Sequence, residues 1–421
     1  MSVHTTEYLH DNIRVGGVMG LEFDDKGKDL GWRTAAWWRN IGMEAQRISE
    51  GLSPSHYAGS LSVGMIQRDL FGWEALDGVM KCTVELFIPG DHPKSRTPGK
   101  DETVQVEFTV PEFKGVLRGD TLVDCYLEDR MEFASETVMN IASSSFSTDS
   151  FAKVLIDNTS HIMQESPGDL VITGAGVLKW GKVGYIEVSV PETFHNKLTG
   201  IEYRPNLLGS TSFDGSVATR WDRTVTNVVC DNTHQYALSQ SGAATGSFKT
   251  RRTKNFSELL KGAREALGLI DDTKTDFDTA IEEWAKVPVT DANFIDWMDI
   301  IVPIPELKEK LVTIKSIQGE VQVPKISTNA LTIAMNKRDQ LEDLWNNDSR
   351  VSPWKGTKLG IVQLGNTWNH HFAVTKGAKS MDGNKLRARV EGNMLKVMDG
   401  TFAKADTKFI DAIDKVLVAA S

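Results

Sequence analysis

Basic and aromatic residues gather between positions 203 and 254 of the chain. Arginine and lysine neutralise phosphate groups whatever the base sequence, and aromatic rings stack on unpaired bases. The combination predicts a groove that holds single-stranded nucleic acid, although a solvated basic loop with a tryptophan in the core would give the same pattern. The candidate contacts are Arg204, Arg220, Arg223, Lys249, Arg251, Arg252 and Lys254, with Tyr203 and Trp221 as stacking residues.

Nucleotide hydrolysis and nucleophilic catalysis find no support in the sequence. Gly174-Ala175-Gly176 resembles the start of a dinucleotide-binding loop, but a third glycine and a following helix are missing, so a glycine pair in a hairpin is favoured. The sequence has neither a glycine-rich loop ending in Gly-Lys-Ser/Thr nor a Gly-x-Ser-x-Gly elbow. We therefore expect a protein without catalytic activity and without a cofactor.

Histidines and cysteines do not form a recognisable metal site in the sequence. His370 and His371 are adjacent, and on a helix they would point about 100° apart, which disfavours a shared metal ion. His234 follows Cys230 by four residues, but two further ligands are missing, so ordinary packing is favoured. A sparse, odd set of cysteines argues against a disulfide framework and fits a reducing cytoplasm. These cysteines are Cys82, Cys125 and Cys230.

The overall charge limits the kind of nucleic-acid binding to be expected. The chain of 421 residues has a formal net charge of −10 and a pI of about 5.5, whereas a general nucleic-acid coat is basic throughout. A local basic stripe on an acidic body is compatible with these values, because the field in a groove depends on where the charges lie. No apolar run approaches the ~20 residues of a membrane span, and the first residues lack a secretory pattern. We expect a cytoplasmic protein with no membrane partner.

The candidate contacts lie on strands that the alternation of apolar and polar residues predicts. Residues 169–179 and 182–190 form one expected hairpin, and residues 203–213 and 216–229 form a second one that turns at Asp214-Gly215. A helix is expected after Cys230, with a cap among residues 231–233. The resulting order β-β-β-β-α predicts an antiparallel sheet followed by a helix.

The remaining patterns complete an α+β fold with a central antiparallel sheet and a helical C-terminal region. We expect a poorly assigned N-terminal arm over residues 1–60, an α+β core over 61–270 and a mainly helical region over 271–421. Trp32, Trp37 and Trp38, within residues 1–60, are expected to be packed, with a stacking platform or an anchor for a partner as alternatives. The other expected elements are strands at 81–88 and 103–110, a partly helical stretch at 136–158, and helices near 256–267, 277–284, 329–346, 360–378 and 409–417.

The stretch that carries the candidate contacts resembles a known family, the phage/plasmid-like proteins built on the domain of unknown function 932. The likeness lies in YRPNLLGSTSFDGS, in TRWDRTVTNVVCDNT and in a basic segment that runs into EALGL, with further matches at VPVTDANF, GTKLGIVQLGNTWNHHFAVT and residues 387–399. It covers roughly residues 60–418, whereas the proline-tryptophan-histidine-glycine element usual in the family is absent from the N-terminus. The resemblance implies a bacteriophage or plasmid origin and a place in the bacterial cytoplasm, and it implies no particular reaction.

A second likeness concerns topology alone. A sheet of hairpins followed by a helix, with basic residues at the junction, is similar to single-strand annealing proteins of the Rad recombination group, which form rings around a basic outer groove. It implies a homo-oligomer, with a ring as one form, that binds and anneals single-stranded DNA in recombination or replication. Two alternatives stay open: a phage protein that binds and modulates a host protein, and a structural protein of the virion.

Overall fold

A computed structural model describes most of the chain between residues 63 and 420, together with two short strands before it. The described residues are 19–23, 29–35, 63–165, 170–179, 181–190, 194–227, 233–234, 247–250, 263–306, 309–316, 319–326, 328–348, 350–373 and 392–420. Three of the candidate contacts, Arg251, Arg252 and Lys254, lie outside these residues.

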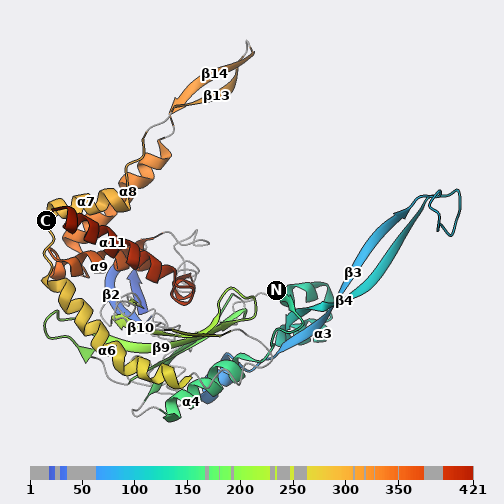
Figure 1. Cartoon of the computed structure of the whole chain (residues 1–421), viewed down its shortest axis with the longest axis horizontal. Coiled ribbons are helices and arrows are strands. Elements are labelled where there is room, and N and C mark those ends of the chain that lie inside the picture. The colour runs from blue at the N-terminus through green and yellow to red at the C-terminus, as the bar shows by residue number, and fades with distance from the viewer. Residues whose placement is uncertain are drawn as a thin grey trace.

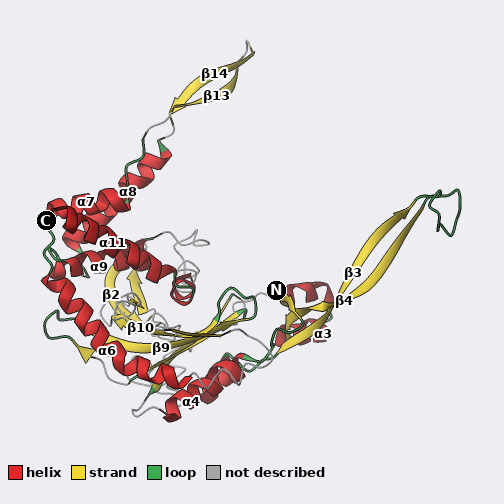
Figure 2. Cartoon of the chain, in the orientation of Figure 1, coloured by secondary structure: helices red, strands yellow, loops and turns green. Residues whose placement is uncertain are grey.

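A curved antiparallel sheet forms the centre of the molecule (Figures 1 and 2). Its main strands follow one another along the chain, because each hairpin returns through a short turn. In the turn of the second hairpin, Gly215 adopts a φ of +70°, and the carboxylate of Asp214 accepts a hydrogen bond from the Ser216 amide at 2.9 Å. Both predicted hairpins are confirmed. The strands are β6 (Val171–Leu178), β7 (Val183–Ser189), β9 (Glu202–Ser212) and β10 (Thr219–Asn227), with the short β8 (Phe194–His195), β11 (Thr233–His234) and β12 (Ser247–Thr250) beside them.

The segment after Cys230 departs from the expected helix. Thr233 and His234 form β11, which pairs with Thr226 and Val225 of β10. The other expected cap residues, Asp231 and Asn232, lie outside the described residues, whereas Thr233 and His234 lie in the strand. The prediction of a helix is therefore wrong at these two residues.

A long helix, α6 (Ala263–Lys286), packs on one face of the sheet (Figure 1). The apolar side chains of Phe277, Ile281 and Trp284 recur at helical spacing and pack with Tyr203 of β9 and Val225 of β10. The sequence suggested two separate helices here, whereas α6 runs without a break, so the predicted domain boundary at residue 270 falls inside one helix.

The C-terminal region is mainly helical, and it packs around a second core. Trp297 and Trp345 are its largest fully buried side chains, and the indole of Trp297 donates to the carbonyl of Phe409 at 3.0 Å. A hairpin of β13 (Glu309–Ser316) and β14 (Gly319–Ile326) interrupts the helices, which the sequence reading did not anticipate. The helices are α7 (Asp291–Ile301), α8 (Asn329–Asn347), α9 (Lys358–Thr367) with the wider turn η6 (Trp368–Phe372), a helical stretch at 392–398, and α11 (Thr401–Ala420).

Residues 75–118 build a two-stranded arm that projects from the body (Figures 1 and 2). β3 (Ala75–Ile88) and β4 (Glu102–Arg118) pair along almost their whole length, and β5 (Val138–Ser143) joins them only at the base. The predicted helix at 136–158 is therefore wrong over residues 138–143. The shorter elements are β1 (Met19–Phe23), β2 (Asp29–Ala35), α2 (Val63–Asp69), α3 (Gly119–Leu127), η1 (Met131–Thr137), η2 (Ala152–Ile156) and α4 (Asp157–Glu165).

The architecture is α+β, as predicted, with antiparallel sheets and with helices concentrated towards the C-terminus. Among the described helices, none has the length and apolar character needed to cross a bilayer.

Candidate nucleic-acid interface on the central sheet

The register of the sheet divides the candidate contacts between its two faces. Side chains alternate along a strand, and residues directly opposite each other on paired strands share a face. Arg220 lies opposite Ser210, and Arg204 lies opposite Thr226, so both arginines belong to one face, here called the polar face. Tyr203, Trp221 and Arg223 lie at the alternate positions and belong to the other face, here called the core face. The polar face also carries Glu187, Ser189, Asn206, Asp222 and Thr224.

Arg223 is a structural residue of the core face. Its guanidinium donates from Nη2 to the Asp276 carboxylate of α6 at 2.7 Å, and the Arg223 side chain is only 1% exposed. Arg220 and Arg223 are three positions apart on one straight strand, so they cannot contact the same ligand from the same side. The sequence-based role of Arg223 as a phosphate contact is therefore corrected to an ion pair that holds α6 on the sheet.

The two aromatic candidates are packed inside the protein. Trp221 lies across Gly209 of β9, where an added Cβ would come within 2.6 Å of the indole nitrogen. The ring of Tyr203 lies 4.7 Å from that of Phe277, and burial together with the neighbouring Asp278 carboxylate raises the pKa of its phenol. Both residues are at most 2% exposed, so neither presents a ring face to a base, and the predicted stacking role does not fit their position.

The remaining basic candidates among the described residues lie on the polar face. Arg220 pairs with Asp222, two positions further along β10, and the Arg220 side chain remains 21% exposed. Lys249 of β12 is the register partner of Arg220, so the two positions share the polar face. Arg204 lies on the same face and is 4% exposed. Three basic positions therefore share one face, but the described side chains of this face between Arg204 and Arg220 are at most 4% exposed, whereas that of Arg220 is 21% exposed.

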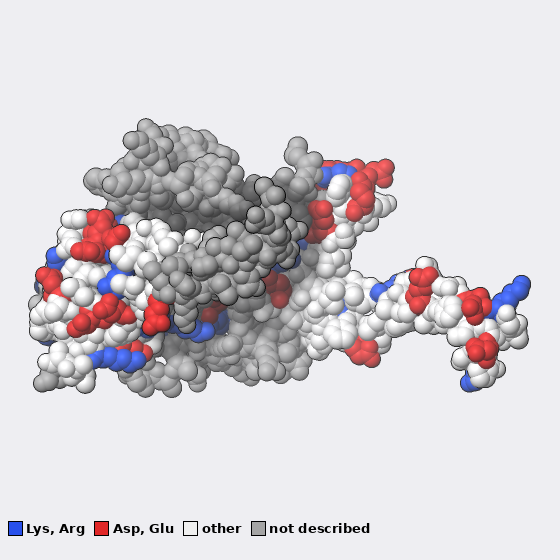
Figure 3. Space-filling view, turned by 90° about the horizontal axis from the view of Figure 1, so that it is seen from above, with Lys and Arg blue, Asp and Glu red and all other residues white. Residues whose placement is uncertain are grey.

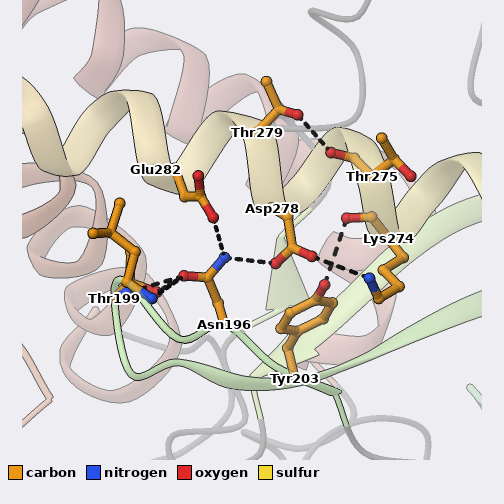
Figure 4. A network of polar contacts seen from close by, with 9 residues as sticks. Asn196, Thr199, Tyr203, Lys274, Thr275, Asp278, Thr279 and Glu282 are labelled. Carbon is orange, nitrogen blue, oxygen red and sulfur yellow. Dashed lines mark hydrogen bonds and ion pairs between the residues drawn. The ribbon is translucent and has the colours of Figure 1, made fainter.

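A hydrogen-bond network fixes the end of the sheet to α6 (Figure 4). The amide of Asn196, just after β8, donates to Asp278 at 2.8 Å and to Glu282 at 3.0 Å, two carboxylates one turn apart on α6. Its oxygen accepts from the backbone of Leu198 and from both donors of Thr199. Asn196 thus satisfies its hydrogen-bonding capacity while it is 4% exposed, as a buried polar group requires.

Asn196→Asp is expected to destabilise the protein by about 2 kcal/mol at pH 7.5, because it replaces two donors by a third carboxylate beside Asp278 and Glu282. Repulsion raises the pKa of the introduced carboxyl in the folded state, so the loss diminishes as the pH falls through that value. Asn196→Ala removes the same donors without adding a charge, and its loss should depend less on pH than that of Asn196→Asp. Urea denaturation of both variants at pH 7.5 and 4.5 checks this, and equal pH dependence in the two variants would contradict it.

A second group of buried polar residues lies between α9, η6 and α11, and the sequence reading did not identify it. Asn366 donates to Asp406 at 3.2 and 3.4 Å, and burial raises the pKa of Asp406 to about 8. His370 stacks on Phe402 at 4.0 Å between ring centres, and its carbonyl accepts from Asn393 at 2.9 Å. All of these polar residues are at most 3% exposed. Within the described residues, histidine, cysteine and acidic side chains do not form a group that suits a metal ion.

The only signal for this group in the sequence was a helix in which amides recur among apolar residues. Gln363 and Asn366 are three positions apart, and His370 follows four positions later, which places them along one side of α9 and η6.

Comparison with known families shows where this architecture belongs. Residues 154–390, more than half of the chain, match the model of the family described as a domain of unknown function, DUF932. The chain belongs to this family. The DUF932 segment begins in η2 and includes the central sheet, α6 and α9, whereas the arm of β3 and β4 precedes it. Neither the search of curated proteins nor that of solved structures found a match.

Proposed function

We propose that this DUF932 protein, of bacteriophage or plasmid origin, binds single-stranded DNA in the bacterial cytoplasm and acts in recombination or replication as a homo-oligomer, without catalysis. Annealing needs no bond to be broken, so a protein of this kind has to hold a strand by its backbone and leave the bases free to pair. The proposal rests on the central sheet and on the basic residues of its polar face.

The shared face of Arg204, Arg220 and Lys249 is the observation that carries the proposal. Arg220 lies at one end of the face, with Lys249 of β12 on one side of it and Ser210 of β9 on the other. Arg204 is six residues from Ser210 on β9, about 20 Å along the strand. Because Arg204 is 4% exposed and the side chains between it and Arg220 are buried, the proposed contact centres on the end of the face that holds Arg220 and Lys249. The basic sequence continues beyond β12 with Arg251, Arg252 and Lys254.

The acidic residues on the polar face set the expected strength of binding. Asp222 pairs with Arg220, and Glu187 of β7 lies at the same level as Asp222, with Leu208 of β9 between them. These carboxylates offset part of the positive charge, so only a few phosphates are neutralised. Because each neutralised phosphate of a single strand contributes about 0.7 to the salt slope, we expect a slope of roughly 2 to 3.

The double variant Arg220→Gln/Lys249→Gln is expected to weaken binding of a labelled oligothymidine about tenfold or more and to lower the salt slope by at least 1. Fluorescence anisotropy at several salt concentrations measures both quantities. Lys81→Gln, on an exposed lysine of the arm, is the matched control and should bind as the wild type does. Wild-type protein that ignores the oligonucleotide at low salt overturns the proposed function, and unchanged binding by the double variant overturns the site.

A further inference from the structure

The arm of β3 and β4 carries only apolar side chains over three successive levels of one face, whereas its opposite face is mostly polar and includes the exposed Phe87. The register pairs Cys82 with Phe108, Val84 with Val106 and Leu86 with Val104, so three successive levels on one face hold apolar side chains alone. The alternate levels pair Thr83 with Glu107 and Glu85 with Gln105, and Lys81 bonds Glu107 at 2.7 Å on this side. The apolar stripe is defined by Cys82, Val84, Leu86, Val104, Val106 and Phe108.

This part of the protein exposes far more apolar surface than the rest of the described chain. Of the 21 large hydrophobic side chains that are exposed among the described residues, 13 lie between Leu76 and Ile141. They include Phe108 of the stripe, 50% exposed, and Tyr126 and Leu127 of α3, each 73% exposed. These 13 side chains are spread over both faces of the ribbon and over α3, η1 and β5; on the stripe itself Leu86 and Val106 are 44% and 39% exposed besides Phe108.

The arm extends well away from the body, so the body does not cover the stripe (Figures 1 and 3). An isolated two-stranded hairpin is marginally stable in water and gains stability when one face packs on an apolar surface. Pairing through the open strand edges is disfavoured, because Lys81, Glu85 and Pro111 lie along them and charged residues and proline oppose edge-to-edge addition. The face of the stripe, and not the strand edges, is therefore the surface on which a partner would pack.

We propose that the apolar stripe packs against the same stripe of a second copy of this chain. The stripe offers no charge or buried hydrogen-bonding side chain to recognise a polar partner, whereas a second arm supplies a surface of the same length, width and twist. A two-fold axis through the contact places the two identical stripes face to face, with the two ribbons about 10 Å apart as in packed sheets. The opposite face of each arm stays in water.

The inference deepens the proposed function, because it names the contact between copies in the homo-oligomer, but it rests on the arm alone. The arm precedes the DUF932 segment and does not carry the basic residues of the polar face. Self-association and DNA binding are therefore separable by experiment.

Light scattering after size exclusion tests the contact with two matched variants of the same ribbon. Phe108→Glu places a charge on the stripe, and Phe87→Glu places the same charge on the opposite face, where Phe87 is 64% exposed. We expect wild type and Phe87→Glu to be oligomers of equal mass and Phe108→Glu to have a smaller mass, with a dissociation constant raised at least tenfold. A monomeric wild type, or equal behaviour of the two variants, overturns the proposal.

Labelling of Cys82 gives a second reading that does not depend on how well Phe108→Glu folds. Cys82 is a free thiol within the stripe, and its modification by a small maleimide can be followed by mass spectrometry of its peptide. We expect labelling to slow at least fivefold as the wild-type concentration rises through the dissociation constant. In the variant Cys82→Ser/Thr83→Cys the thiol moves to the face of the arm opposite the stripe, and its labelling should be independent of concentration. Concentration-independent labelling of Cys82 overturns the contact.

Failure of this contact is distinguishable from failure of the proposed function. Anisotropy with the labelled oligothymidine is measured on Phe108→Glu under the same conditions. A smaller mass with an unchanged salt slope supports the arm contact and leaves the DNA site intact. An oligomer that depends on Phe108 but does not bind DNA keeps the contact and overturns the proposed function.

Discussion

Asp406→Asn is expected to stabilise the protein by at least about 3 kcal/mol at pH 8 and to leave it nearly unchanged at pH 4. Asp406 lies on α11 and is 3% exposed. Burial is the main cause that raises the pKa of its carboxyl to about 8, and the amide of Asn366, which donates to it, acts in the opposite direction. Asparagine has nearly the same shape, keeps an oxygen that accepts from Asn366 and cannot ionise.

The sign of this effect follows from proton binding in the folded and unfolded states. Below its ordinary value of 3.8 the carboxyl of Asp406 is protonated in both states, so its ionisation does not affect folding. Between pH 3.8 and about 8 the unfolded chain gives up the proton and the folded chain keeps it, so stability falls by up to about 1.4 kcal/mol per pH unit. Above that range the loss is constant. The asparagine variant avoids this loss, and its advantage over the wild type grows from pH 4 to pH 8.

Urea denaturation at each unit of pH measures the unfolding free energy of the variant and of the wild type. The contributions of the other titrating groups are the same in both proteins, so they cancel in the difference. Asp411→Asn, at an exposed position of the same helix, is the control and should stay within about 0.5 kcal/mol of the wild type throughout. A constant difference between the Asp406→Asn variant and the wild type across this range would show that Asp406 is ionised in the folded protein.

The central sheet could be predicted because its signals are local. Residues 171–189 and 202–227 alternate at period two or carry turn residues at the reversals, and both hairpins formed as expected. Local signals misled at Thr233, because threonine favours helix caps and is also common in strands, and here it lies in β11. The hairpin of β13 and β14 has plain alternation, and it was overlooked because the region around it reads as helical.

The candidate site was less accessible to sequence reasoning than the fold, for two reasons. The first was avoidable, since the three-residue spacing of Arg220 and Arg223 already placed them on opposite faces of a strand. The second was not, because the carboxylate that binds Arg223 lies 53 residues away on α6, and Asn366 and Asp406 are 40 residues apart. Charge along a sequence therefore does not distinguish an arginine that meets a ligand from one that meets a buried carboxylate.

Asp276→Ala is expected to destabilise the protein by about 3–5 kcal/mol, because it leaves the guanidinium of Arg223 buried without its carboxylate. The Arg223 side chain is 1% exposed and that of Asp276 is 18% exposed, so water replaces the lost partner poorly. Urea denaturation measures the loss. Glu107→Gln breaks the Lys81–Glu107 pair, whose side chains are both more than half exposed, and should cost at most about 1 kcal/mol.

The double variant Arg223→Met/Asp276→Ala separates a buried charge from a general packing defect. If the loss in Asp276→Ala comes from the unpaired guanidinium, removal of that charge restores much of the stability, because an apolar side chain of similar length needs no partner. A double variant less stable than Asp276→Ala would instead assign the loss to packing between β10 and α6. Where it folds, the double variant should also keep the salt slope of the wild type with oligothymidine, since Arg223 lies on the core face and the proposed strand runs along the other.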